Sequence, residues 1–292
     1  MNVTFAAEIG YAFVMASRGR PRGSSLRTAV LEHLGAERRT TLDLKRDRAW
    51  LEELTPDPES LIRRLRERGL LHTVQRGRYL VNVDARPSRW PRLEALDPLA
   101  TVILARLDVE FCLSWHSALW HHGLIDQQAS CLFVAVKEAR KRPAKVGIYE
   151  IRFVTVTARR FFGCEFVEDF EVPVPIARVE KALVDSFDRP ELAAPVPVIA
   201  NALRGAWDAG MLDPDRLTDY ALAFGSKAVI RRVGFFMDLY DIPGSEKLAP
   251  HIGRKSAMPL APGREPPRPH RVNSRWLVYE DPSIVGPARS LK

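Results

Sequence analysis

The stretch from 41 to 82 constrains the fold most, because helix signals and strand signals follow one another closely there. Asp57 and Pro58 are typical of a helix start, since an aspartate accepts free N–H groups and a proline fits the first turn. Gly69 is typical of a helix end. The apolar residues between these positions recur with helical spacing and predict a buried stripe: Leu61, Ile62 and Leu65.

Arginines surround that stripe and predict a cationic helix face: Arg63, Arg64, Arg66 and Arg68. Two strand patterns follow, 70–75 and 79–83, and the turn between them is Arg76-Gly77-Arg78. A helix with a row of arginines beside an arginine-tipped hairpin can place positive charge along two phosphate tracks of a duplex. We therefore predict a winged helix-turn-helix that binds double-stranded DNA.

Taken alone, an exposed arginine-rich helix is more often plain solvated surface. The order of the elements favours DNA binding, because helices expected at 25–34 and 45–54 precede the arginine-rich helix and its hairpin. Arginine contacts phosphates at least as often as guanine edges, so the pattern does not predict which bases are recognised. The predicted DNA contacts are Lys45, Arg46, Arg63, Arg64, Arg66, Arg68, Arg76 and Arg78.

Length and charge distribution predict two domains with different partners. The 292 residues suffice for two cores, which we expect at 1–87 and 88–292. Residues 1–90 hold 17 Lys and Arg against 11 Asp and Glu, whereas 91–250 hold 19 against 22 and 251–292 hold 8 against 3. A basic head joined to a mildly acidic middle fits a nucleic-acid-binding domain attached to a domain with another task.

Composition and cysteine usage indicate a globular protein of the cytoplasm. The apolar fraction is 46%, and no apolar run approaches the roughly 20 residues of a membrane span. Glu8 interrupts the apolar N-terminal patch and no basic residue precedes it, so we expect no signal peptide. The odd number of cysteines and the absence of CxxC spacing predict buried free thiols in a reducing compartment: Cys112, Cys131 and Cys164.

The second domain is expected to be mixed α/β with a helical C-terminal half, which makes the whole chain α+β. Strands are expected at 132–136 and 148–156. Helices are expected at 99–107, 114–122, 175–187, 196–209, 215–224 and 226–240. The proline-rich last 50 residues are expected to be irregular until a short strand at 275–279.

Two of these helices, 175–187 and 226–240, have amphipathic patterns. The charged residues of the first are expected to face outward: Glu180, Lys181 and Asp185. Those of the second are expected beside its apolar face: Lys227, Arg231 and Arg232. Ordinary packing explains both patterns, and a docking surface for a partner protein is the alternative.

No pattern in the chain indicates catalysis. His116, His121 and His122 invite a metal, but the first two lie five apart and do not share a helix face as an i, i+4 pair would. The acidic cluster 165–171 lacks the lysine two residues further on that a magnesium-dependent nuclease pattern requires. Phosphate-cradling, dinucleotide-binding and nucleophile-elbow motifs are absent from the sequence. We therefore predict no enzymatic activity, no metal and no cofactor.

The order of motifs resembles the AbiEi family, the antitoxins of the abortive-infection AbiE toxin–antitoxin systems. The resemblance covers most of residues 40–240 and rests on RLRERGLLHTVQRGRYLV, DPLATVIL, SWHSALWHHGLIDQ, RFVTV, FFG, PIARVEKALVDSFDRPE and SKAVIRRVGFFMDLY. Its most specific pieces are Trp115, Ser117, Ala118 and Gly123, the pair Phe162-Gly163, and Glu180, Lys181, Ala182, Leu183 and Asp185. The chain departs from the family at 176–178, where Ile-Ala-Arg replaces the Ala-Ser-Pro that often precedes Glu-Lys-Ala.

This resemblance implies a prokaryotic cytoplasmic protein with two partners and no membrane contact. The head would bind inverted repeats in its own promoter as a homodimer and repress the operon. The C-terminal domain would neutralise a cognate nucleotidyltransferase-like toxin, in phage defence by abortive infection. The alternative is a winged-helix transcriptional regulator whose C-terminal domain senses a ligand or forms a dimer, with no toxin. The basic tail, 254–275, is a candidate second DNA contact.

Overall fold

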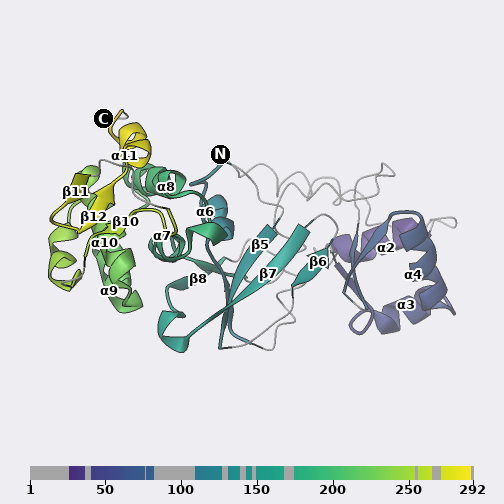
Figure 1. Ribbon diagram of the computed structural model, residues 1–292. Coiled ribbons are helices and arrows are strands. Elements are labelled where there is room, and N and C mark those ends of the chain that lie inside the picture. Colours follow the sequence, from purple (N-terminus) through teal and green to yellow (C-terminus); the bar gives the residue numbers. More distant parts are fainter. Residues whose placement is uncertain are drawn as a thin grey trace. The chain divides into compact units, whose positions relative to one another are not determined.

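The computed structural model describes residues 26–36, 41–75, 77–81, 109–126, 131–138, 143–146, 149–167, 174–253, 256–264 and 271–290 (Figure 1). The chain divides into two compact units: Met1–Leu107 with Glu168–Val174, and Asp108–Val167 with Pro175–Lys292. We call the described residues between 26 and 81 the head and those between 109 and 290 the body. The expected domain boundary at 87 and the expected helix 99–107 lie outside the described residues.

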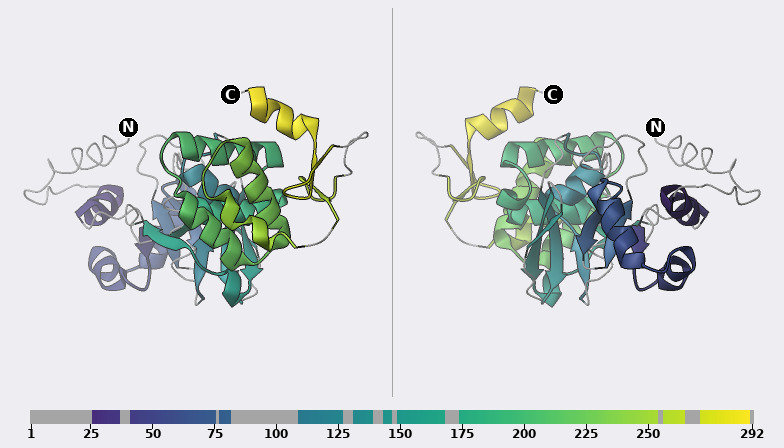
Figure 2. Two further views of the ribbon diagram at one scale, coloured as in Figure 1. Left: turned by 90° about the vertical axis from the view of Figure 1, so that its left-hand side faces the viewer. Right: turned by 90° about the vertical axis from the view of Figure 1, so that its right-hand side faces the viewer.

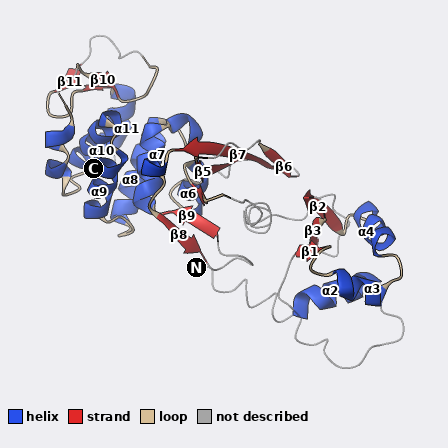
Figure 3. Cartoon of the chain, turned by 90° about the horizontal axis from the view of Figure 1, so that it is seen from below, coloured by secondary structure: helices blue, strands red, loops and turns tan. Residues whose placement is uncertain are grey.

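The head combines helices with one small antiparallel sheet, drawn by secondary structure in Figure 3. Its elements in chain order are α2 (Leu26–Ala36), β1 (Thr41–Asp43), α3 (Arg48–Leu54), α4 (Pro58–Glu67), β2 (Leu71–Gln75) and β3 (Arg78–Val81). The strand order is β1-β3-β2, and β3 pairs antiparallel with both neighbours. The last strand of the hairpin is therefore central, and it ties the hairpin to the segment before α3.

The boundaries of α4 agree with the sequence prediction. The Asp57 side chain accepts the Ser60 N–H at 3.0 Å, and Pro58 occupies the first turn. Gly69 has a φ of 70°, the left-handed conformation that ends a helix and that glycine adopts without strain. The apolar stripe of α4 enters a core made of Val30, Leu34, Leu42, Leu51, Leu61, Ile62, Leu65, Leu71 and Tyr79.

The preceding helix begins three residues later than predicted. The expected helix 45–54 is α3, which begins at Arg48, because residues 44–46 form a turn. The backbone N–H of Asp47 donates to the carbonyl of Asp43 at 2.8 Å within that turn. The turn carries Lys45 and Arg46 at its exposed side.

The body is built on a mixed six-stranded sheet with helices gathered along one side of it (Figure 2). Its strands are β4 (Phe111–Leu113), β5 (Cys131–Lys137), β6 (Ala144–Val146), β7 (Tyr149–Val156), β8 (Cys164–Val167) and β9 (Val174–Ala177). Their order is β6-β7-β5-β4-β9-β8. Strand β5 runs parallel to β7 and antiparallel to β4, and β4 runs parallel to β9. The chain is thus α+β, as predicted.

The helices of the body surround one central helix, α7 (Val179–Asp188). The others are α6 (His116–His121), α8 (Val196–Asp208), α9 (Pro214–Phe224), α10 (Lys227–Leu239) and α11 (Pro282–Ser290), with short 3-10 turns at 158–160, 190–192, 245–247 and 249–251. Helix α7 contacts α6, α8, α9 and α10, and every residue from Val179 to Phe187 is buried. No helix of the described chain is long and apolar enough to cross a membrane.

Two sequence predictions about the body were wrong. The helix expected at 175–187 begins only at Val179, and Val174–Ala177 is the buried strand β9, because Ile176 pairs with Leu113 of β4 and this backbone belongs to the sheet. The last 50 residues hold more regular structure than the one short strand expected at 275–279. Within the described part they form β10 (Met258–Pro259), β11 (Arg271–Asn273), β12 (Val278–Glu280) and α11, and the three strands make a second sheet in the order β10-β12-β11.

A buried tryptophan of this C-terminal sheet region packs against α10. Trp276 is fully buried, and its ring lies where a Cβ atom on Gly234 would be, with ring carbons at 2.2 Å from that position. The indole N–H of Trp276 donates to Asp238 at 2.7 Å, and the Ser245 hydroxyl donates to the same carboxylate at 2.5 Å. The helix therefore needs a glycine at 234 so that the tryptophan can approach it.

We expect Gly234→Ala to destabilise the body by about 1–3 kcal/mol, because the added methyl group overpacks the Trp276 contact. Gly205→Ala on α8 is the matched control, since a Cβ at Gly205 meets no atom within 4 Å. Alanine has the higher helix propensity, so the control should be neutral or stabilised by up to about 1 kcal/mol. Urea unfolding followed by tryptophan fluorescence measures both; equal midpoints for the two variants would contradict the close contact.

Candidate nucleic-acid interface

Helix α4 separates its apolar residues from its arginines. Leu61, Ile62 and Leu65 are buried in the head core, whereas Arg63, Arg64, Arg66 and Arg68 are exposed. Only weak polar contacts reach the arginine side chains, from Arg63 Nη2 to Ser60 Oγ and from Arg64 Nε to the Ser60 carbonyl, both at 3.4 Å. Among the described residues, none of these four guanidinium groups forms an ion pair with a carboxylate. Their charge is therefore presented to solvent.

The cations of the turn before α3 lie in the same head. Lys45 is exposed, and its side chain forms no ion pair with any of the described residues. Arg46 is about half exposed, and its Nε lies 3.6 Å from Asp47 Oδ1. Arg48, the next arginine along the chain, is exposed and bonds Glu52 one turn further on at 2.8 Å. Lys45 and Arg46 are thus accessible to a ligand, while Arg48 has its charge matched by a neighbour.

Of the two arginines predicted at the hairpin tip, Arg78 is described by the structure and Arg76 lies outside the described residues. Arg78 has an internal partner: its Nε donates to Asp43 Oδ2 at 2.5 Å, and the side chains of Arg78 and Asp43 are 26% and 10% exposed. Partial burial by itself would raise the pKa of the Asp43 carboxyl, but the bonds from Arg78 and from the Lys45 N–H hold that pKa below its ordinary value.

Asp43 and Asp47 are residues of this region that the sequence analysis missed. Both are buried, in the middle of a strongly basic segment. The Asp47 carboxylate accepts the backbone N–H of Asp43 at 2.8 Å, and the Asp43 carboxylate accepts the N–H of Lys45 at 2.9 Å. A usable signal was present, because an aspartate on a strand end and a second one four residues later are typical of side chains that organise a turn.

The three histidines that the sequence singled out, His116, His121 and His122, are not arranged as a metal site. His122 Nε2 lies 2.8 Å from the Ala177 carbonyl, and the His121 and His122 rings meet edge to face at 5.2 Å. His116 is half-buried, and this burial lowers the pKa of its imidazole. Within the described ranges, no group of three His, Cys, Asp or Glu side chains is arranged to hold a metal ion.

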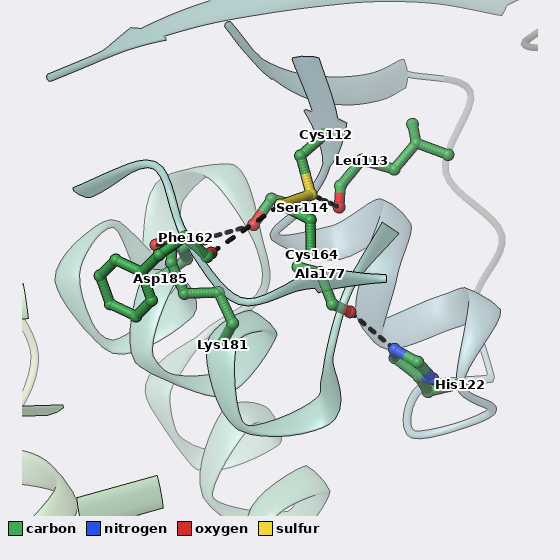
Figure 4. Close-up of a disulfide and its surroundings, with 9 residues drawn as sticks. All are labelled: Cys112, Leu113, Ser114, His122, Phe162, Cys164, Ala177, Lys181 and Asp185. Carbon is green, nitrogen blue, oxygen red and sulfur yellow. Dashed lines mark hydrogen bonds and ion pairs between the residues drawn. A yellow bond between two sulfur atoms is a disulfide. The ribbon is translucent and has the colours of Figure 1, made fainter. Parts of the chain in front are cut away.

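The charged residues of α7 do not face outward, which corrects the sequence prediction. Asp185 accepts a bond from Ser114 at 2.5 Å and pairs with Lys181, and all three side chains are buried (Figure 4). The Lys181 ammonium also lies over the Phe162 and Phe224 rings, at 5.0 and 5.5 Å from their centroids. Because α7 is surrounded by other helices, its polar side is an internal network rather than a surface.

The arginines of α10 are buried as well, so they do not flank a docking surface. Arg232 donates to the carbonyls of Leu260 and Phe187 at 2.7 and 2.8 Å. Arg231 donates to the carbonyls of Ile252 and Ser256, both at 3.1 Å. Burial lowers the pKa of both guanidinium groups. These arginines therefore act inside the body, where they bind the irregular backbone that leads to the C-terminal sheet.

The cysteines correct a further prediction, because they are not all free. Cys112 on β4 and Cys164 at the start of β8 form a disulfide (Figure 4). Cys131 is a free thiol. The bond links segments 52 positions apart in the sequence, beside the Ser114–Asp185 contact. Burial raises the pKa of the Cys131 thiol above its ordinary value.

The fold, but not a family, is shown by comparison with known proteins. The chain is similar to the crystal structure of the RV2827C protein from Mycobacterium tuberculosis, with a TM-score of 0.66 and 16% sequence identity over 94% of this chain and 96% of that one. At this identity the likeness concerns the fold alone. No family model and no curated protein matches the chain.

The disulfide predicts one reactive thiol in the denatured, unreduced chain. Iodoacetamide should then modify Cys131 alone, and it should modify all three cysteines once the chain has been reduced. Peptide mass spectrometry locates the adducts. Modification of Cys112 and Cys164 without prior reduction would contradict the bond.

Proposed function

We propose that the head is a winged helix-turn-helix and that the protein is a DNA-binding transcriptional autorepressor. The observation that carries this proposal is α4, whose four exposed arginines have no carboxylate partner among the described residues while its other face is anchored in the head core. In this arrangement α4 is the helix that enters the major groove, and the β2–β3 hairpin is the wing. Lys45 and Arg46 then contact the DNA backbone and set the register.

An anchored helix supports this function better than a mobile cationic segment would. The buried stripe of α4 fixes the rotation of the helix about its axis, so its arginines point in set directions before DNA arrives. Less side-chain and backbone freedom is then lost on binding. Arginine can bond two acceptors of guanine in the major groove or contact phosphates, and both require such a fixed helix.

We also propose that the protein is an AbiEi-type antitoxin whose body neutralises a nucleotidyltransferase-like toxin in the cytoplasm. This part rests on the motif resemblance. In the body those motif residues are largely internal: the Phe133 N–H donates to Ser117 Oγ at 2.8 Å, and a Cβ at Gly163 would lie 2.8 Å from Tyr220 and 3.1 Å from Lys181. The motifs therefore specify how the body folds, and contacts to a toxin must come from exposed residues elsewhere.

The DNA-binding proposal predicts a steep dependence of affinity on salt. If about six cations neutralise phosphates, the affinity for the protein's own upstream promoter DNA should fall by on the order of a thousandfold between about 50 and 200 mM salt. A gel-shift or fluorescence-anisotropy series measures this. Binding that is absent, or that does not change with salt, would end the proposal.

The double variant Arg64→Ala/Arg66→Ala should weaken this binding and leave the heat-unfolding transition unchanged, because both side chains are exposed. Its matched control is Arg152→Ala/Lys247→Ala on the body, where each side chain is exposed, lies near a carboxylate and is outside the basic tail. The control removes the same charge from the other unit. An equal loss of affinity in both variants would indicate unspecific attraction by overall charge.

The antitoxin proposal predicts growth rescue. Expression of the neighbouring gene alone should arrest growth, and co-expression of this chain should restore it, including co-expression of the Arg64→Ala/Arg66→Ala variant that represses poorly. Colony counts under separate inducible promoters give the result. A harmless neighbour, or arrest that co-expression does not relieve, would instead favour a regulator without a toxin partner.

A further inference from the structure

Two buried carboxylates flank the turn that carries Lys45 and Arg46. Asp43, the last residue of β1, and Asp47, directly before α3, are 7% and 3% exposed. Negative charge on a DNA-binding surface opposes the approach of phosphates, since like charges repel. If this region binds DNA, the two buried aspartates must favour binding in another way that outweighs their repulsion of the phosphates.

Their bonds join the hairpin to the turn before α3. Asp43 lies opposite Arg78 in the antiparallel pairing of β1 with β3, and its two oxygens accept Arg78 Nε at 2.5 Å and the Lys45 N–H at 2.9 Å. Beside this pair, the Leu44 N–H donates to the carbonyl of Gly77 at 2.8 Å. One carboxylate thus connects the base of the hairpin turn with the backbone of the exposed Lys45.

Releasing Arg78 to a phosphate would leave the Asp43 carboxylate buried without its cation. Removing one partner from a buried ion pair is strongly unfavourable, because the remaining charge has lost its solvent and its counter-charge. A phosphate contact by Arg78 would have to offset that loss, whereas a contact by an exposed α4 arginine carries no such penalty. The geometry therefore distinguishes two kinds of cation in the head: exposed arginines of α4, which can bind phosphate without such a loss, and Arg78, which stays bonded to Asp43.

We propose that Arg78 is a positioning residue and not a phosphate ligand, and that the Asp43–Arg78 pair holds the hairpin turn and Lys45 at the spacing that the DNA backbone requires. This inference rests on the proposed DNA-binding function. It assigns Asp43, an acidic residue, a favourable role in binding a polyanion. It also assigns the phosphate contacts to the exposed cations of α4 and of the turn before α3.

Asp43→Asn in the full chain tests the proposal, because the two explanations predict opposite signs. If Asp43 only repelled phosphates or withheld Arg78, its neutralisation would tighten binding to the promoter DNA. If it positions the hairpin, the Kd should rise about tenfold. The matched control is Glu52→Gln, which removes one negative charge from an exposed ion pair on α3 and should bind as well as or slightly better than the unchanged protein.

The salt dependence of binding tests the same point through Arg78 and does not require the Asp43 variant to fold. Arg78→Gln should weaken binding while the slope of log affinity against log salt stays unchanged, since no phosphate contact is lost. Arg66→Gln, on α4, should reduce that slope by about 0.9. The double variant Asp43→Asn/Arg78→Gln should bind no worse than the weaker single variant, because both changes break one interaction.

Tighter binding by Asp43→Asn, or a slope reduced by Arg78→Gln as much as by Arg66→Gln, would overturn the positioning role alone. Failure of the unchanged protein to bind promoter DNA would overturn the DNA-binding function and this inference with it. The two failures are therefore distinguishable in one set of titrations.

Discussion

In the described part of the chain, the buried side chains of Lys181, Arg231 and Arg232 each have partners that receive their charge or their hydrogen bonds. Lys181 is inside because Asp185 pairs with it and aromatic rings surround it, and Arg232 is inside because two backbone carbonyls accept its N–H groups. An unpartnered buried charge would cost several kcal/mol, comparable to the whole stability of a domain. The arrangement of the body helices and the exposure of the α4 arginines both follow from this constraint.

In the head the same constraint distinguishes cations that look alike in the sequence. Arg66 and Arg78 lie twelve positions apart in one basic segment, yet Arg66 is exposed with no carboxylate partner among the described residues and Arg78 bonds Asp43. The proposed DNA contact therefore depends on fewer side chains than the count of arginines suggests. In the proposed interface, Asp43 is part of the framework that orients the exposed cations.

The local elements could be predicted because their signals are local. The start of α4 at Pro58, its end before Gly69 and its buried stripe follow from residues that touch one another within the helix or its caps. The same holds for β5, β7, α8, α9 and α10, which lie within two residues of their predicted ends. The outward face predicted for α7 was wrong because an amphipathic pattern assumes one wet side, and this helix has neighbours all around.

The sequence by itself determined where α4 begins and ends, which side of α4 is apolar, and that its other side is rich in arginine. Only the tertiary structure decided which charges are available to a ligand. Asp43 meets Arg78 across 35 positions, Ser114 meets Asp185 across 71, and Trp276 meets Asp238 across 38. The chemistry of each of these groups depends on a partner brought to it by folding, and no periodicity along the chain encodes such distant pairs.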